Sequence, residues 1–151
     1  MVGTRRGDRG YTVIELLLVM VIISVIAGIT YVRMRPTLEH ARVRGAAGIL
    51  AGDLQYAQVM AARLRTPMVI SVNTAGLTYQ IASRAGTVYR SRDLSPASDY
   101  ALEEIQATPT TFEVFPNAVA AQSATYTVGL NGYRRRVTFS RAGQIRVTTV
   151  P

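Results

Sequence analysis

The stretch "RRGDRGYTVIELLLVMVIISVIAGITYV", residues 5–32, joins a basic leader to a long apolar run. In the 22 residues from Tyr11 to Val32, only Glu15 carries a formal charge. A helix of that length measures roughly 33 Å, about the thickness of the hydrocarbon core of a bilayer. A core helix of a soluble protein is shorter and less evenly apolar. We therefore expect residues 11–32 to form a single membrane-spanning helix.

An ordinary secretory signal is the main alternative for this stretch, because Val25-Ile26-Ala27 resembles a small-residue cleavage site before Gly28. Two features oppose it: the apolar run continues to Val32, and Glu15 lies within it. Charge leaves the orientation open, since arginines stand on both sides of the run: Arg5, Arg6 and Arg9 before it, and Arg33, Arg35, Arg42 and Arg44 after it.

The residues around the start of the run form a recognisable motif. Gly10 is followed by Tyr11-Thr12-Val13-Ile14-Glu15-Leu16. The pattern resembles the class III signal of type IV pilins and type II secretion pseudopilins, with Tyr where Phe is usual. The resemblance implies that residues 1–10 are a leader, which prepilin peptidase removes by cutting between Gly10 and Tyr11, and that Tyr11 is then N-methylated. A glycine at the cut site allows close approach of the protease to the backbone.

Glu15 needs a physical reason, because an unpaired carboxylate at membrane depth is costly. Cleavage supplies one by creating a free amine on Tyr11, and opposite charges attract strongly in a low dielectric. In the family that the motif resembles, the Glu of one subunit pairs with the N-terminal amine of the next. We therefore expect Glu15, with Thr12 beside it, to act in filament assembly. The alternative is a carboxylate stabilised only by the helix dipole.

Residues 33–66 predict an amphipathic continuation of the helix. Apolar residues recur at steps of four and three, which keeps them on one helical face: Val43, Ala47, Leu50, Leu54, Ala57, Ala61 and Leu64. Asp53 and Gln58 fall off this stripe, and Pro36 predicts a kink or a local break. Gly45, Gly48 and Gly52 form a second stripe, suited to packing on the protein's own sheet or to close approach of a neighbouring helix. The single histidine, His40, is expected to be solvated.

Residues 67–151 predict an antiparallel β-sheet domain. Seven segments have the strand pattern: 68–73, 77–83, 87–91, 110–115, 124–130, 133–140 and 144–150. Residues 92–109 are polar and predict a loop with a helical turn at 102–105. Asn131-Gly132 predicts a type I′ hairpin turn. The fold class is therefore α+β and pilin-like, with a long N-terminal helix packed on an antiparallel sheet. Residues 53–72 and 137–147 are similar to the GspH/FimT branch of the pilin superfamily.

The C-terminal strands are basic, with five arginines and no acidic residue from Asn131 onward. Strand alternation places Arg134, Arg136 and Arg146 on one face, with Arg141 at the turn. Some FimT-like minor pilins bind DNA through a Gly-Arg-x-Arg motif, but residues 143–146 here read Gly-Gln-Ile-Arg and lack the first arginine. Arginines that block edge-to-edge pairing of the sheet are the alternative explanation.

Taken together, the sequence predicts a minor pilin or pseudopilin rather than an enzyme, since no nucleophile–base pair, phosphate loop or metal-ligand cluster is present. We expect no cofactor. The expected location is the inner membrane, spanned once with the C-terminal domain outside the cytoplasm, and then a pilus or pseudopilus. Expected partners are other subunits, prepilin peptidase, the inner-membrane assembly platform and membrane lipid. A DNA-binding minor pilin of natural competence is the alternative function. The net charge of +8 favours anionic partners only weakly.

Overall fold

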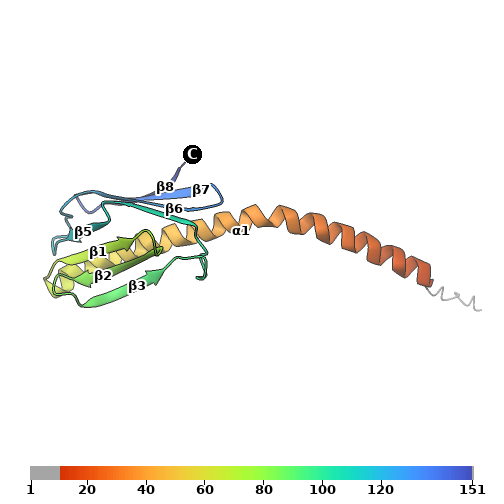
Figure 1. Ribbon diagram of the computed structural model, residues 1–151, viewed down its shortest axis with the longest axis horizontal. Coiled ribbons are helices and arrows are strands. Elements are labelled where there is room, and N and C mark those ends of the chain that lie inside the picture. Colours follow the sequence, from red (N-terminus) through yellow and green to blue (C-terminus); the bar gives the residue numbers. More distant parts are fainter. Residues whose placement is uncertain (1–10, 151) are drawn as a thin grey trace, which may run out of the picture. The chain divides into compact units, whose positions relative to one another are not determined.

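The computed structural model describes residues 11–150, which form one long helix followed by eight strands (Figure 1). The helix is α1 (Val13–Leu64). The strands are β1 (Met68–Asn73), β2 (Thr78–Ser83), β3 (Val88–Asp93), β4 (Glu104–Thr108), β5 (Thr111–Val114), β6 (Ala124–Leu130), β7 (Tyr133–Phe139) and β8 (Ile145–Val150). The chain divides after Thr37 into two compact units. The predicted fold class, a long helix with antiparallel strands, is confirmed.

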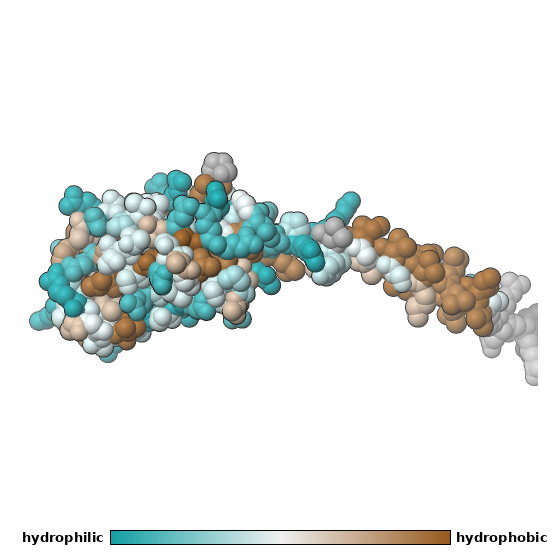
Figure 2. Space-filling view, viewed as in Figure 1, coloured by the Kyte–Doolittle hydropathy of each residue, from teal (hydrophilic) through white to brown (hydrophobic). Residues whose placement is uncertain are grey.

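The first unit contains the apolar part of α1, whose large apolar side chains are all at least 45% exposed between Tyr11 and Tyr31. Figure 2 shows this apolar surface in brown along the N-terminal part of the helix. The hydroxyls of Ser24 and Thr30 donate to backbone carbonyls one turn earlier, at 2.8 and 2.9 Å. Each hydroxyl is thereby satisfied within the helix, as an apolar environment requires. The helix continues through Pro36, so the local break is not observed.

In the second unit, α1 buries the predicted stripe from Val43 to Ala61, with exposed fractions of 1% or less. Complete burial of leucines such as Leu50 and Leu54 contributes about 1.5–3 kcal/mol each. The burial predicted from the stripe is wrong at two positions. Leu64, its last member, is 38% exposed, and Asp53, which lies off the stripe, is 4% exposed. The core is one cluster that combines side chains of α1 with side chains of the strands.

The strands form two antiparallel sheets rather than the single sheet that we expected. One has the order β3-β2-β1-β5 and the other the order β4-β6-β7-β8. All seven predicted strands are present. The loop predicted for residues 92–109 is partly wrong, because β4 occupies its end and pairs with β6. Only Ile105 on this short strand is fully buried, so the apolar alternation that identifies a strand is almost absent.

Two turns have the predicted backbone. Asn131 and Gly132 connect β6 to β7 with φ of 48° and 81°, and a type I′ turn requires positive φ at both positions. Gly143, in the turn between β7 and β8, has a φ of 82°. Together these turns fix the register of the basic strands β7 and β8.

Candidate functional site

The N-terminal end of α1 is capped by Thr12. Its hydroxyl and its carbonyl oxygen both accept from the backbone N–H of Glu15, at 3.3 and 3.1 Å. Thr12 and Glu15 have the spacing of a capping box, in which a Thr precedes a Glu by three residues. The sequence contains this signal, but we did not consider a capping role for Thr12. Thr12 therefore has a structural role that is independent of any neighbouring subunit.

The side chains at the proposed processing site are open to their surroundings. Tyr11 is 79% exposed, and Glu15 is exposed on the first turn of α1. Among residues 11–150, no hydrogen bond or ion pair engages the carboxylate of Glu15. Gly10 lies outside the described residues, so cleavage between Gly10 and Tyr11 stays a prediction.

The predicted basic residues of β7 and β8 lie on the outer face of the second sheet. Val137 and Phe139 are fully buried on the opposite face, while Arg134, Arg136 and Arg146 are exposed. The strand register pairs Arg136 with Thr148 and Thr138 with Arg146, which puts the two arginines on the same face of adjacent strands. The Nε of Arg134 forms an ion pair with Glu104 at 2.9 Å. Arg136 and Arg146 are therefore the more available pair for an anion.

Gly143, which matches the glycine of the DNA-binding motif, is explained by the fold. Its φ is positive, and a Cβ at this position would lie 2.3 Å from the carbonyl oxygen of Ala118. Gln58 holds the same turn through a 2.7 Å hydrogen bond to the Gly143 carbonyl. Arg141 is exposed in this turn, and its backbone carbonyl accepts from the N–H of Ala120. The glycine is thus required by the turn whether or not DNA binds.

An ion cluster centred on the buried carboxylate of Asp53 was missed in the sequence. The hydroxyl of Tyr79 on β2 donates to Asp53 at 2.7 Å, and Arg90 and Arg92 on β3 form ion pairs with the same carboxylate. Arg90 also lies over the ring of Tyr56, with its guanidinium carbon 4.0 Å from the ring centroid. Asp53 therefore ties α1 to two strands of the first sheet. The alternating arginines of β3 were the available signal, but their partner was not identifiable from spacing.

Burial and charge act in opposite directions on the pKa of Asp53. Burial raises it, but hydrogen bonds from Tyr79, Arg90 and Arg92 together outweigh burial and leave the pKa below its ordinary value of 3.8. Burial, followed by the hydrogen bond to Asp53, raises the pKa of the Tyr79 phenol far above its ordinary range. The cluster is therefore ionised at Asp53 and neutral at Tyr79 near neutral pH. It is a structural clamp, because every carboxylate contact is internal.

His40 is half-buried rather than solvated. Its ring stacks on Tyr133 with a centroid distance of 3.9 Å and an interplanar angle of 26°. Beside it, Asn131 donates to Glu39 at 2.8 Å. These contacts join the start of the buried part of α1 to the β6–β7 hairpin. Among residues 11–150 no cluster of potential metal ligands includes His40.

Residues 5–31 match the prokaryotic N-terminal methylation motif. The fold resembles those of two minor subunits of secretion or pilus systems. The type IV minor pilin FimU of Pseudomonas aeruginosa is 22% identical in one crystal form, with a TM-score of 0.59 over 73% of this chain and 90% of FimU. In a second crystal form the TM-score is 0.56. The minor pseudopilin EpsH of the Vibrio cholerae type 2 secretion system is 11% identical, with a TM-score of 0.58 over 72% of this chain and 97% of EpsH.

The chain therefore combines the prokaryotic N-terminal methylation motif with a pilin-like fold. The motif covers residues 5–31, and the fold similarity extends over about 70% of the chain. No curated protein sequence matches the chain. In this pilin-like protein the motif leads directly into an exposed apolar helix, an arrangement that indicates membrane anchoring.

Proposed function

We propose that this pilin-like protein is a minor pilin or pseudopilin, a structural subunit of a type IV pilus or a type II secretion pseudopilus. The observation that carries the proposal is the continuity of the methylation motif with an apolar helix that nothing in residues 11–150 covers. Such a surface needs lipid or other apolar helices around it. When a subunit moves from the inner membrane into a filament, its apolar helix leaves the lipid and packs against the helices of other subunits.

Cleavage of the leader creates the positive amine on Tyr11 that can pair with the negative carboxylate of Glu15. Prepilin peptidase cuts between Gly10 and Tyr11, Tyr11 is N-methylated, and its new amine is available to the Glu15 carboxylate of a neighbouring subunit. Before assembly the helix spans the inner membrane once, with the second unit outside the cytoplasm and the assembly platform beside it. The unengaged carboxylate of Glu15 supports this scheme, because it leaves the charge available to another chain.

The first test is mass spectrometry of the mature N-terminus in the native host. The expected result is a chain that begins at N-methylated Tyr11. A mature chain that begins at Met1 or Gly28 would contradict the proposal. Either result is independent of how well the chain is incorporated into filaments.

The second test removes the negative charge of Glu15 in one variant and keeps it in another. Glu15→Leu is expected to leave membrane insertion intact and to reduce incorporation into filaments by tenfold or more, since breaking a desolvated ion pair costs about 3–5 kcal/mol. Glu15→Asp keeps the charge and should retain part of the incorporation. Normal incorporation of Glu15→Leu would refute the role of this residue.

DNA binding in natural competence is the second candidate, favoured by the placement of Arg136 and Arg146 on one exposed face without ion pairs among the described residues. Two phosphate contacts predict weak retention of duplex DNA, with a log–log salt slope of about −2. Arg136→Gln/Arg146→Gln should abolish retention by the full chain in detergent. The matched control is Arg33→Gln/Arg42→Gln, which removes the same charge from exposed positions outside β7 and β8. Equal retention by both variants would exclude this site.

A further inference from the structure

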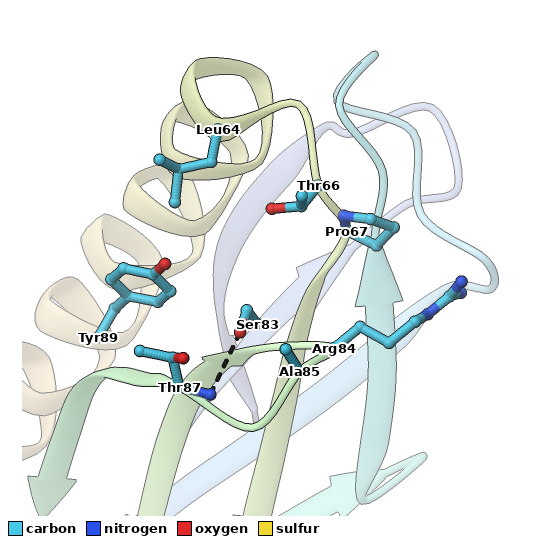
Figure 3. Close-up of a pocket in the computed structure, with 8 residues that line it drawn as sticks. All are labelled: Leu64, Thr66, Pro67, Ser83, Arg84, Ala85, Thr87 and Tyr89. Carbon is cyan, nitrogen blue, oxygen red and sulfur yellow. Dashed lines mark hydrogen bonds between the residues drawn. The ribbon is translucent and has the colours of Figure 1, made fainter.

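A groove lies at the C-terminal end of α1, where the helix meets the β2–β3 hairpin (Figure 3). Its volume is about 670 Å³, within the range of roughly 300–1,000 Å³ typical of ligand pockets. In Figure 3, Leu64, Thr66, Ser83, Thr87 and Tyr89 surround the open space, and the side chain of Arg84 extends away from it. The groove lies entirely within the second unit.

The lining of the groove is mainly apolar and is not covered by the described chain. Leu64 is 38% exposed and Tyr89 is 37% exposed. The periodicity of α1 places Leu64 on the core stripe, yet the sheet does not extend far enough to cover it. The helix ends at Leu64, and the next residue, Arg65, has a φ of 53°. Two elements thus present large apolar side chains toward one open volume.

Tyr89 is directed into the groove by a β-bulge. The register of β2 and β3 shifts between Ile81 and Ala82, so that Ile81 pairs with Arg90 and Ala82 pairs with Val88. Tyr89 is the extra residue and has no partner on β2. Bulges re-aim side chains and are enriched at sheet edges and beside functional sites. Without the bulge, alternation would place Tyr89 on the face opposite to Arg90.

The strand that carries Tyr89 also has an open edge. β3 is the terminal strand of the sheet β3-β2-β1-β5 and pairs only with β2. Because no described strand pairs with its outer edge, backbone groups on that side are available to another extended chain. Addition of a strand at such an edge provides affinity through the main chain, and a pocket beside the edge provides specificity.

The charge around the groove favours an anionic partner. None of the eight lining residues is acidic. Arg63 and Arg65 flank Leu64 in the chain, both are exposed, and neither side chain has a hydrogen bond or ion pair among residues 11–150. Arg84 is neutralised by Glu113 at 2.6 Å, so the two unpaired arginines determine the local sign. An apolar groove beside unpaired arginines is complementary to an apolar side chain followed by a carboxylate.

We propose that this groove and the edge of β3 dock an extended segment of another filament subunit, which pairs with β3, inserts an apolar side chain between Leu64 and Tyr89, and directs a carboxylate toward Arg63 or Arg65. This inference rests on the proposed function for the identity of the partner. Duplex DNA shares the negative charge but has no side chain that fits an apolar groove beside a strand edge.

The test uses the full chain in lipid nanodiscs and overlapping synthetic peptides that tile the other chains with a prepilin-type motif in the same genome. Peptides that combine an apolar residue with Asp or Glu are expected to bind. Leu64→Ser and Tyr89→Ser should weaken binding about tenfold or more, as expected for central anchors of an interface. Val147→Ser is the matched control, because Val147 is 37% exposed on the other sheet and lies outside the groove.

Two changes to the bound peptides separate the parts of the contact. Methylation of alternate backbone amides should abolish binding if the peptide adds a strand to β3, and replacement of Asp or Glu by Lys should weaken it. Thr87→Trp fills the groove without removing any core side chain, so a loss of binding at an unchanged unfolding temperature would be due to the filled groove. Thermal unfolding of each variant verifies the fold.

Three outcomes would overturn the docking proposal: no peptide binds, charge-reversed peptides bind equally well, or duplex DNA alone competes for the groove. Each of these leaves the proposed function intact if the mature chain begins at Tyr11 and enters filaments. A chain that begins elsewhere would instead refute the proposed function, whatever the peptides do.

Discussion

Two buried tyrosines differ in what their hydroxyl groups contact. Tyr79 donates to Asp53 at 2.7 Å, whereas the hydroxyl of Tyr126 is buried with no hydrogen-bond partner among the described residues. A buried polar group without a partner costs free energy, and a satisfied one contributes about 1–3 kcal/mol when its partner is charged. The same Tyr→Phe change is therefore expected to have opposite effects at the two positions.

The first prediction is that Tyr79→Phe lowers the free energy of unfolding by about 1–2 kcal/mol and that Tyr126→Phe raises it by about 1 kcal/mol. Denaturant unfolding of the full chain, followed by near-ultraviolet circular dichroism, measures both. The folded-state pKa of each phenol is raised above its ordinary value of 10.0, mainly by burial. Each tyrosine therefore loses stabilisation as pH rises above 10, and each Phe variant should show less of this loss.

The second prediction concerns the pH dependence of Asp53. Its folded-state pKa lies below 3.8, so its contribution to stability is complete above 3.8 and is lost as pH falls below that value. Asp53→Asn should cost roughly 2–4 kcal/mol at neutral pH, because two arginines lose a buried partner. The same variant should flatten the decline in stability in acid.

The matched control for Asp53 is Glu113→Gln, which breaks the exposed ion pair with Arg84. An exposed pair contributes about 0–1 kcal/mol, so this variant should change the free energy of unfolding very little. If Asp53→Asn were as mild as Glu113→Gln, the buried cluster would not be the clamp between α1 and β3.

At the level of single residues, the sequence shows candidates that are marked by a local pattern and does not show those made by tertiary contact. Glu15 is such a candidate because a charge within an apolar run is unusual, and its role in assembly stays a prediction. Asp53 is not such a candidate, because its three partners lie on strands distant in the chain. The same applies to Tyr89, whose direction depends on a bulge that no local pattern marks.

Among the elements, α1 was the most predictable because its apolar stripe is long and regular. The strands beside clear turn residues were also predicted, as at Asn131-Gly132. β4 was missed because only Ile105 reaches the core, and two prolines near it indicated a loop. The division into two sheets could not be predicted, since it depends on which strands pair across long connections.

The glycine stripe of α1 faces away from the core at two of its three positions. A Cβ at Gly48 or Gly52 would meet no atom within 4 Å, and both glycines are exposed. Packing of these two on the protein's own sheet, one of the two explanations we considered, is therefore wrong. Gly45 does approach the second unit, since its Cβ would lie 3.7 Å from the ring of Tyr100.

The third prediction is that Gly48→Ala/Gly52→Ala raises the free energy of unfolding by about 1–2 kcal/mol, because each glycine costs about 0.5–1 kcal/mol in a helix. Thermal unfolding measures the gain. Gly143→Ala is the contrasting control and should destabilise strongly, since its φ is positive and its Cβ position is occupied by Ala118. A loss of stability in the Gly48/Gly52 variant would mean that this face is packed in the folded subunit.

At the scale of the whole molecule, the two compact units differ in what stabilises them. Among the described residues, every fully buried side chain belongs to the second unit, and the first of them along the chain is Val43. Among residues 11–31 and 33–37 no large apolar side chain is buried, so this part of the helix depends on surrounding lipid or helices. The folding of the second unit should therefore be independent of the residues before Leu38.

The fourth prediction is that a fragment of residues 38–151 folds in water without detergent. Its unfolding should be a single cooperative transition, because its core is one cluster that joins α1 to both sheets. The loss of residues 11–37 shortens α1 at its exposed end and should change the free energy of unfolding by about 1 kcal/mol or less, since no core contact is removed. The Asp53 variant should be destabilised by the same amount in the fragment as in the full chain, because the cluster lies wholly within it. An unfolded fragment, or a different effect of Asp53→Asn, would show that the N-terminal helix contributes to the core of the second unit.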